Sequence, residues 1–183
     1  MHRACRYASH NGALITLADA ILPPLQPTRR FVYAHPAHIV AFAGGVGLAP
    51  FAPGTFGTLL AFPLFGVLNA TIDGVAQLYV FILFFLIGTW ACHRAGAALG
   101  VADHGGMVWD ETVAFLLVLI FTPAGWLWQL AAFGLFRLFD IAKPPPIRHF
   151  DRTLKNGFGV MFDDLLAAGY TLLVLALAKI LIA

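Results

Sequence analysis

Long apolar stretches separated by short polar segments dominate the chain. Five of them approach the roughly 20 mostly apolar residues that a membrane-spanning helix needs, and they occupy residues 56–72, 75–92, 108–122, 126–141 and 165–183. The second stretch carries no charged residue, whereas Pro63 in the first predicts a kink. The third and fourth stretches are short, so they form either two tilted spans or a re-entrant pair around residues 122–125. No alternating pattern is long enough to favour strands.

The basic residues lie almost entirely on one side of the predicted spans. If all five stretches cross the membrane, the turns after the first and the third contain no Lys or Arg. All but one of the 11 Lys and Arg residues then share the other side, and the exception is Lys179. Because cytoplasmic loops carry an excess of Lys and Arg, this distribution predicts that the basic side is cytoplasmic.

The composition agrees with a membrane protein. Of the 183 residues, 60% are hydrophobic and 11% are charged, against about 45–50% and about 25% in ordinary globular domains. So few charges would not cover the surface of a soluble domain of this size. We therefore predict an all-α fold, an integral membrane helical bundle of about four to five transmembrane or re-entrant helices. Its polar loops converge on the cytoplasmic face.

The N-terminal region differs from the rest of the chain. Residues 1–36 contain several arginines and prolines and no clear signal peptide, so we expect a poorly ordered cytoplasmic arm. Residues 37–183 are predicted to form one membrane-embedded domain. A net charge of +2 without a basic tract argues against a nucleic-acid partner. Cys5 and Cys92 are isolated and predict no disulfide framework.

Acidic residues gather near the ends of the predicted spans. Among the nine Asp and Glu residues are three pairs or near-pairs: Asp110 with Glu111, Asp140 with Asp151, and Asp163 with Asp164. The predicted topology places these six paired residues on the cytoplasmic face. Carboxylates beside apolar helices are costly without a compensating cation, and oxygen ligands without a Cys or His cluster suit Mg²⁺ better than Zn²⁺. The pattern predicts a site for a phosphate monoester, with two metal ions or with one metal ion plus Lys or Arg.

Each acidic group also has a local explanation when it is taken alone. Asp110 and Glu111 could simply favour a helix N-terminus, and Asp163 and Asp164 could cap the last span. Arg137 and Asp140 are spaced i,i+3 and could form an ion pair at a helix end. Asp151 could lie in a solvated loop. Their predicted convergence on one membrane surface favours a shared site.

A segment rich in Gly, Pro and Thr, residues 44–58, leads into the first span. Glycines allow backbone N–H groups to approach an anion, and the N-terminus of a following helix attracts it. Gly54, Thr55 and Thr58 are therefore candidates for binding a substrate phosphate. A turn followed by an ordinary Thr cap explains the same residues, and the Gly-Lys-Ser/Thr of a Walker sequence does not follow.

Four stretches together resemble the phosphatidylglycerophosphatase A family of bacterial membrane lipid phosphatases. They are GLAPFAPGTFGTLLAFPL (47–64), HGGMVWDE (104–111), FRLFDIAKPPPIRHFDR (136–152) and GFGVMFDDLLAAG (157–169). The resemblance covers about residues 37–170. It departs from the family pattern at Asn156, where a Gly-Gly is common, and at Ala114, where the family often has Gly.

The resemblance implies Mg²⁺-dependent hydrolysis of phosphatidylglycerophosphate to phosphatidylglycerol and phosphate, a step of phospholipid biosynthesis. It also implies a phospholipid substrate and an active site on the cytoplasmic side of the bacterial inner membrane. The oligomeric state stays open. On this hypothesis the metal ligands are Asp110, Glu111, Asp163 and Asp164. The cations that neutralise the phosphate are Lys143, Arg137 and Arg148, and the nucleophile or general base is Asp140 or Asp151.

Three rival interpretations fit the residues less well. A membrane transporter or ion-relay protein that uses the acidic cluster would place acids deep within its spans, whereas here they gather at one end. A phospholipid synthase would carry a DG…AR…G…D…D pattern, and the other class of membrane lipid phosphatase would carry KxxxxxxRP; both are absent. A non-catalytic scaffold has no need for so many acids on one face.

Overall fold

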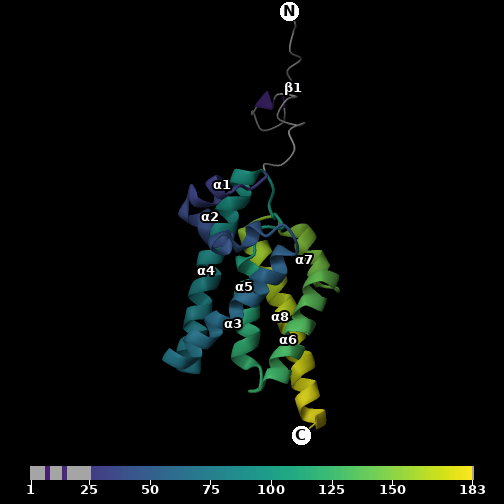
Figure 1. Cartoon of the computed structure of the whole chain (residues 1–183). Helices are drawn as coiled ribbons and strands as arrows, with labels where there is room; N and C mark the ends of the chain where they lie inside the picture. Colours follow the sequence, from purple (N-terminus) through teal and green to yellow (C-terminus); the bar gives the residue numbers. More distant parts are fainter. Residues whose placement is uncertain (1–6, 9–13, 16–25, 183) are drawn as a thin grey trace, which may run out of the picture.

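The computed structural model describes residues 7–8, 14–15 and 26–182, and these are almost entirely helical (Figure 1). Two short strands, β1 (Tyr7–Ala8) and β2 (Leu14–Ile15), pair antiparallel. The helices are α1 (Arg29–Tyr33), α2 (Pro36–Ala41), the 3₁₀ helix η1 (Ala43–Leu48), α3 (Pro53–Thr71), α4 (Gly74–Leu99), α5 (Trp109–Phe121), α6 (Trp126–Ala142), α7 (Ile147–Thr153) and α8 (Gly157–Ile182). The predicted helical membrane bundle is confirmed.

Three of the described helices, α3, α4 and α8, are long and apolar enough to cross a membrane. By contrast, α5 has 13 residues, which at about 1.5 Å per residue is roughly 20 Å and less than the ~30 Å hydrocarbon core. It packs against α3, α4, α6 and α8, and most of its side chains, including Phe115 and Leu116, are buried. The third apolar stretch is therefore a short helix inside the bundle.

The last helix begins earlier than the apolar run alone predicts, at Gly157 instead of residue 165. The Asn156 side chain accepts a hydrogen bond of 2.9 Å from the Gly159 N–H, which satisfies one of the free donors of the first turn. Asp163 and Asp164 consequently lie inside α8, beyond its first turn. The alternative in which they cap the last span is excluded.

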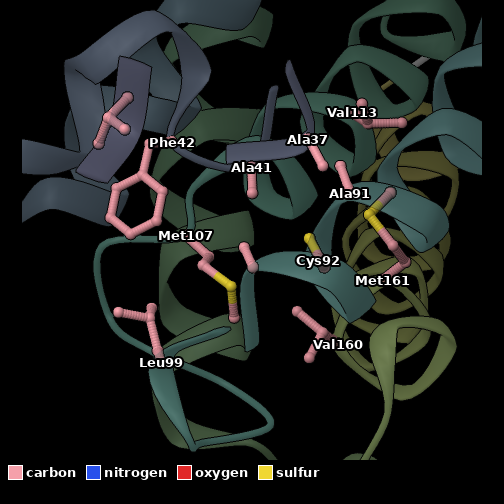
Figure 2. Close-up of a cluster of buried hydrophobic side chains, with 12 residues drawn as sticks. Ala37, Ala41, Phe42, Ala91, Cys92, Leu99, Met107, Val113, Val160 and Met161 are labelled. Atoms are coloured by element: carbon pink, nitrogen blue, oxygen red, sulfur yellow. The ribbon is translucent and has the colours of Figure 1, made fainter. Parts of the chain in front are cut away.

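Two hydrophobic clusters hold the helices together. One joins α2, α4 and α8 through small residues such as Ala41 and Ala91, with Cys92 and Met161 between them (Figure 2). The other surrounds Phe115 of α5 with side chains of α3, α6 and α8. Small residues let helix backbones approach closely, which is how helices associate within a membrane.

The polar segments lie toward one end of the bundle. Figure 1 shows α1, α2 and α7 at this end and the C-terminus at the other. Helix α1 begins after Thr28, whose hydroxyl accepts from the Phe31 N–H, and its Val32 is fully buried in the first cluster. Most of the expected N-terminal arm lies outside the described residues. The described parts are β1, β2 and residues 26–36, which contain α1 and the beginning of α2.

Candidate active site

The N-terminal ends of α3 and α5 meet at the polar end of the bundle through close backbone packing. A Cβ on Gly57 would overlap Val108, and a Cβ on Gly54 would overlap the Glu111 carboxylate. The Thr112 hydroxyl donates a 2.8 Å hydrogen bond to the Gly57 carbonyl and so ties the two helices together. The glycines of the Gly/Pro/Thr-rich segment therefore serve first to bring α3 against the acidic start of α5.

Three carboxylates from two helices converge beside this contact. Asp110 and Glu111 lie in the first turn of α5 and Asp164 lies in α8, with one oxygen of each within 4.8 Å of the others. Asp110 is 6% exposed and Asp164 is 4% exposed. Asp110 Oδ1, Glu111 Oε2 and Asp164 Oδ2 are buried and have no hydrogen-bond partner among the described residues. We call these three residues the carboxylate triad.

The triad fits a hard divalent cation. Buried polar atoms are nearly always paired, and a buried unpaired charge is costly. Three carboxylates this close also repel one another unless a cation lies between them. Oxygen-only ligand sets of this kind suit Mg²⁺, Ca²⁺ or Mn²⁺. The unpartnered oxygens of the triad are the strongest structural sign of a metal site.

Arg137 of α6 lies beside the triad and bridges three groups. Its Nη1 is 2.6 Å from Asp140 Oδ2, 3.5 Å from Glu111 Oε1 and 3.3 Å from the Thr58 hydroxyl oxygen. The expected i,i+3 ion pair of Arg137 and Asp140 is thus present. Thr58 is fully buried, and its hydroxyl donates to the Gly54 carbonyl while accepting from Arg137. The Thr58 hydroxyl therefore joins the Gly54 carbonyl to the guanidinium of Arg137.

Lys143 forms a second charged group beside the first. Its Nζ is 3.0 Å from Asp151 Oδ1 and also pairs with Asp163 Oδ2. Burial lowers the pKa of Lys143, but the charges and hydrogen bonds of Asp163 and Asp151 outweigh burial and raise it. Burial likewise raises the pKa of Asp151, yet the hydrogen bond and charge of Lys143 hold that pKa below its ordinary value. Lys143 therefore stays protonated and Asp151 stays ionised at neutral pH.

The chain around Lys143 explains why its side chain reaches two carboxylates. Lys143 follows α6 in the left-handed conformation, with φ 42°, and a run of three prolines restricts the backbone after it. The Tyr170 hydroxyl of α8 donates a 2.8 Å hydrogen bond to the Pro145 carbonyl, and Ile147 at the start of α7 is fully buried. The α6–α7 turn is thereby fixed against α8.

The other predicted site residues lie outside the triad. Asp163 lies next to the triad in sequence, but its carboxylate pairs with Lys143. Thr55 is half-buried in the first turn of α3. Arg148 is exposed on α7, and no hydrogen bond or ion pair within the described residues joins it to the triad.

Sequence reasoning missed Asp103. This residue precedes α5 and lines a small pocket with Asp151 and Lys155. A signal was present, because Asp103 directly precedes the stretch HGGMVWDE, which contains Asp110 and Glu111. An acid this close to a predicted metal site is a natural further candidate.

Comparison with known proteins shows the family of the chain. Residues 39–179 match the family described as phosphatidylglycerophosphatase A. The chain belongs to the phosphatidylglycerophosphatase A family. It is 47% identical over 150 residues to a phosphatidylglycerophosphatase A of Haemophilus influenzae, covering 81% of this chain and 91% of the relative. A phosphatidylglycerophosphatase A of Escherichia coli is 40% identical over 139 residues, which is 75% of this chain and 80% of the relative.

A more divergent relative carries a different name. A putative phosphatidylinositol-3-phosphatase of Bacteroides thetaiotaomicron is 38% identical over 142 residues, covering 74% of this chain and 88% of the relative. No solved structure matches the chain. Membership in the phosphatidylglycerophosphatase A family makes the chain a phosphatase, and the matched residues include the triad, Arg137 and Lys143. The transporter interpretation is left without support.

Proposed function

We propose that this protein hydrolyses phosphatidylglycerophosphate to phosphatidylglycerol and inorganic phosphate, that it uses Mg²⁺, and that its active site faces the cytoplasm at the inner membrane. The observation that carries this proposal is the buried carboxylate triad with its unpartnered oxygens, beside Arg137 and Lys143 at one end of a membrane bundle. The names of two relatives support the substrate.

Asp110, Glu111 and Asp164 would hold the metal ion. Bound there, Mg²⁺ would neutralise charge on the phosphate oxygens and orient the phosphate. The original hypothesis included Asp163 as a fourth ligand. Its pairing with Lys143 supports an indirect role instead, in which Asp163 positions the ammonium group next to the metal site.

Arg137, Lys143 and the start of α3 would bind the phosphate. The guanidinium of Arg137 is held by Asp140, Glu111 and Thr58, and its Nε has no partner among the described residues. A planar guanidinium can bind two phosphate oxygens at once. Helix α3 has 19 residues and no side-chain cap within the described structure, so the N–H group of Gly54 suits an anion. The Thr55 N–H donates to the Ala52 carbonyl, so Thr55 would bind the phosphate through its hydroxyl. Arg148 would contribute positive charge at the entrance.

Asp140 and Asp151 are the candidates for nucleophile or general base. Both are ion-paired, Asp140 with Arg137 and Asp151 with Lys143, and their side chains are 12% and 27% exposed. Each carboxylate lies beside the cation that would bind the phosphate. Comparison of the Asp140→Asn and Asp151→Asn variants under single-turnover conditions identifies which of them acts in the chemical step.

The distribution of charge supports the proposed orientation. Arg148 and Arg152 of α7 and Lys155 flank the active-site end, whereas Lys179 lies in the last turn of α8 at the other end. The more basic end of a membrane protein faces the cytoplasm. A lipid substrate would then enter from the cytoplasmic leaflet.

A substrate panel tests this function. The purified protein in detergent should release phosphate from phosphatidylglycerophosphate in the presence of Mg²⁺. Release from phosphatidylinositol 3-phosphate and from soluble glycerol 3-phosphate should be at least about tenfold slower in kcat/KM. A preference for phosphatidylinositol 3-phosphate would contradict the proposed substrate and favour the activity in the name of the more divergent relative. No release from any of the three by folded protein would contradict it.

A further inference from the structure

The acids at the active site differ in what neutralises them. Arg137 pairs with Asp140 at 2.6 Å and more distantly, at 3.5 Å, with Glu111 of the triad. Asp151 and Asp163 share the ammonium group of Lys143. Within the described residues, each member of the carboxylate triad keeps a buried oxygen without a partner. Protein cations thus compensate Asp140, Asp151 and Asp163. The triad keeps unpaired buried oxygens, which a cation from solution would compensate.

The Lys143 ammonium is linked to the triad through helix α8. Asp163 and Asp164 are neighbours in α8, and Asp163 binds Lys143 while Asp164 belongs to the triad. Phosphatases with two metal ions hold them about 3.5–4 Å apart with shared or neighbouring carboxylates. The ammonium of Lys143 joins Asp151 and Asp163, as a second metal ion would join the carboxylates of such a site.

The position of this ammonium is fixed by the fold. Lys143 has a left-handed backbone conformation at the end of α6, and the turn after it is held to α8 by the hydrogen bond of Tyr170 to Pro145. Its carboxylate partners come from α7 and α8. The amine is thus held between two carboxylates that are its ion-pair partners.

We propose that the Lys143 ammonium occupies the place of a second divalent cation, so that this enzyme binds one metal ion per chain, at Asp110, Glu111 and Asp164. This inference rests on the proposed function, since it concerns the metal used in that reaction. A fixed ammonium supplies positive charge to the phosphate without having to be recruited from solution. It is a point charge with three donors, which suffices for Asp151, Asp163 and one phosphate oxygen.

Metal counting tests this inference without reference to activity. Mn²⁺ is the probe, because it takes the same oxygen ligands as Mg²⁺ and its free form is measured by electron paramagnetic resonance. Purified wild-type protein should bind one Mn²⁺ per chain. Lys143→Ala removes the ammonium and leaves Asp151 and Asp163 facing the vacated space, so it should bind two. Lys143→Arg keeps a cation there and should bind one. Lys179→Ala, at the far end, is the matched control and should also bind one.

The outcomes separate this inference from the proposed function. Two Mn²⁺ in the wild type, or one in folded Lys143→Ala, would overturn the role of Lys143 and leave a metal-dependent phosphatase intact. No Mn²⁺ in the wild type would contradict the metal role itself. A wild-type count of two overturns the inference even if Lys143→Ala fails to fold. Asp164→Asn should weaken the single site at least about tenfold, which assigns the bound ion to the triad.

Discussion

At the scale of single residues, three oxygen atoms account for most of the chemistry we propose. Asp110, Glu111 and Asp164 lie at the polar end of the bundle, and each keeps a buried oxygen unpaired within the described structure. A folded protein retains such groups when a ligand compensates them. In a protein that needed only a stable bundle, the same residues would reduce stability, since isolated carboxylates near a membrane cost free energy.

Asp164→Asn tests the triad directly. The change removes one negative ligand but also relieves repulsion among buried carboxylates, so the protein should stay folded while turnover falls at least about 100-fold. Phosphate release and thermal unfolding are measured on the same preparation. Asp73→Asn is the control, because Asp73 caps α4 and Asn caps a helix equally well. Near-wild-type turnover in Asp164→Asn would remove this residue from the site.

Gly54→Ala tests the contact between α3 and the triad. The added Cβ would overlap Glu111 Oε1 and approach Arg137 Nη2 to 3.2 Å. Both side chains must move, so Mn²⁺ affinity and turnover should each fall at least about tenfold. Gly66→Ala on the same helix meets no described atom within 4 Å and should change stability by no more than about 1 kcal/mol. Equal effects of the two substitutions would show that the contact has no functional part.

The sequence predicted the acids of the site but not how they are grouped. The triad residues and the cations Arg137 and Lys143 were all predicted candidates, because charged residues near apolar spans are few. Pairing of Asp163 with Lys143 could not be predicted, since it depends on how the α6–α7 turn packs on α8. Asp103 was missed because it belongs to no acidic pair. The direct roles of Gly54, Thr55, Thr58 and Arg148 stay predictions.

At the scale of elements, the short helix α5 organises the molecule. It carries Asp110 and Glu111 in its first turn and is surrounded by α3, α4, α6 and α8. The sequence could not decide whether this stretch crosses the membrane, because an apolar helix looks the same facing lipid or facing protein. In the structure, α5 is too short to cross the membrane. Because it is surrounded by other helices, its two acids lie in the interior of the bundle.

The start of α8 depends on close packing against α4. A Cβ on Gly157 would overlap the backbone of Thr89 and His93 in α4, and backbone atoms cannot move aside as a side chain tip can. Gly157→Ala should therefore destabilise the fold by about 1–3 kcal/mol, seen as a lower unfolding temperature in detergent. Gly169→Ala in the same helix meets no described atom within 4 Å and is the control. An unchanged unfolding temperature for Gly157→Ala would contradict this packing.

At the scale of the whole molecule, the account requires one orientation in the membrane. The triad, Arg137, Lys143 and the basic residues of α7 share one end, and the connection between α3 and α4 lies at the other. The direction of the bundle was predicted from Lys and Arg positions alone. On this proposed orientation, the substrate would be reached from the cytoplasmic side.

Thiol labelling measures this orientation. Asn69→Cys near the end of α3 and Arg152→Cys on α7 both replace exposed residues. They are introduced into a parent protein in which Cys5 is changed to Ser, and the other native cysteine, Cys92, is buried. A membrane-impermeant maleimide added to intact spheroplasts should label Asn69→Cys. It should label Arg152→Cys only after lysis, and the parent protein sets the background. The reverse pattern would place the active site on the outer face of the membrane.

The central claim is that the carboxylate triad holds a divalent ion on which phosphate release depends. The most direct measurement is phosphate release from phosphatidylglycerophosphate by the detergent-purified protein after its divalent ions are removed with excess chelator. The account predicts that release falls to background and returns stepwise as Mg²⁺ is added back, in parallel with occupancy of the site. Release that continues unchanged in excess chelator would contradict it.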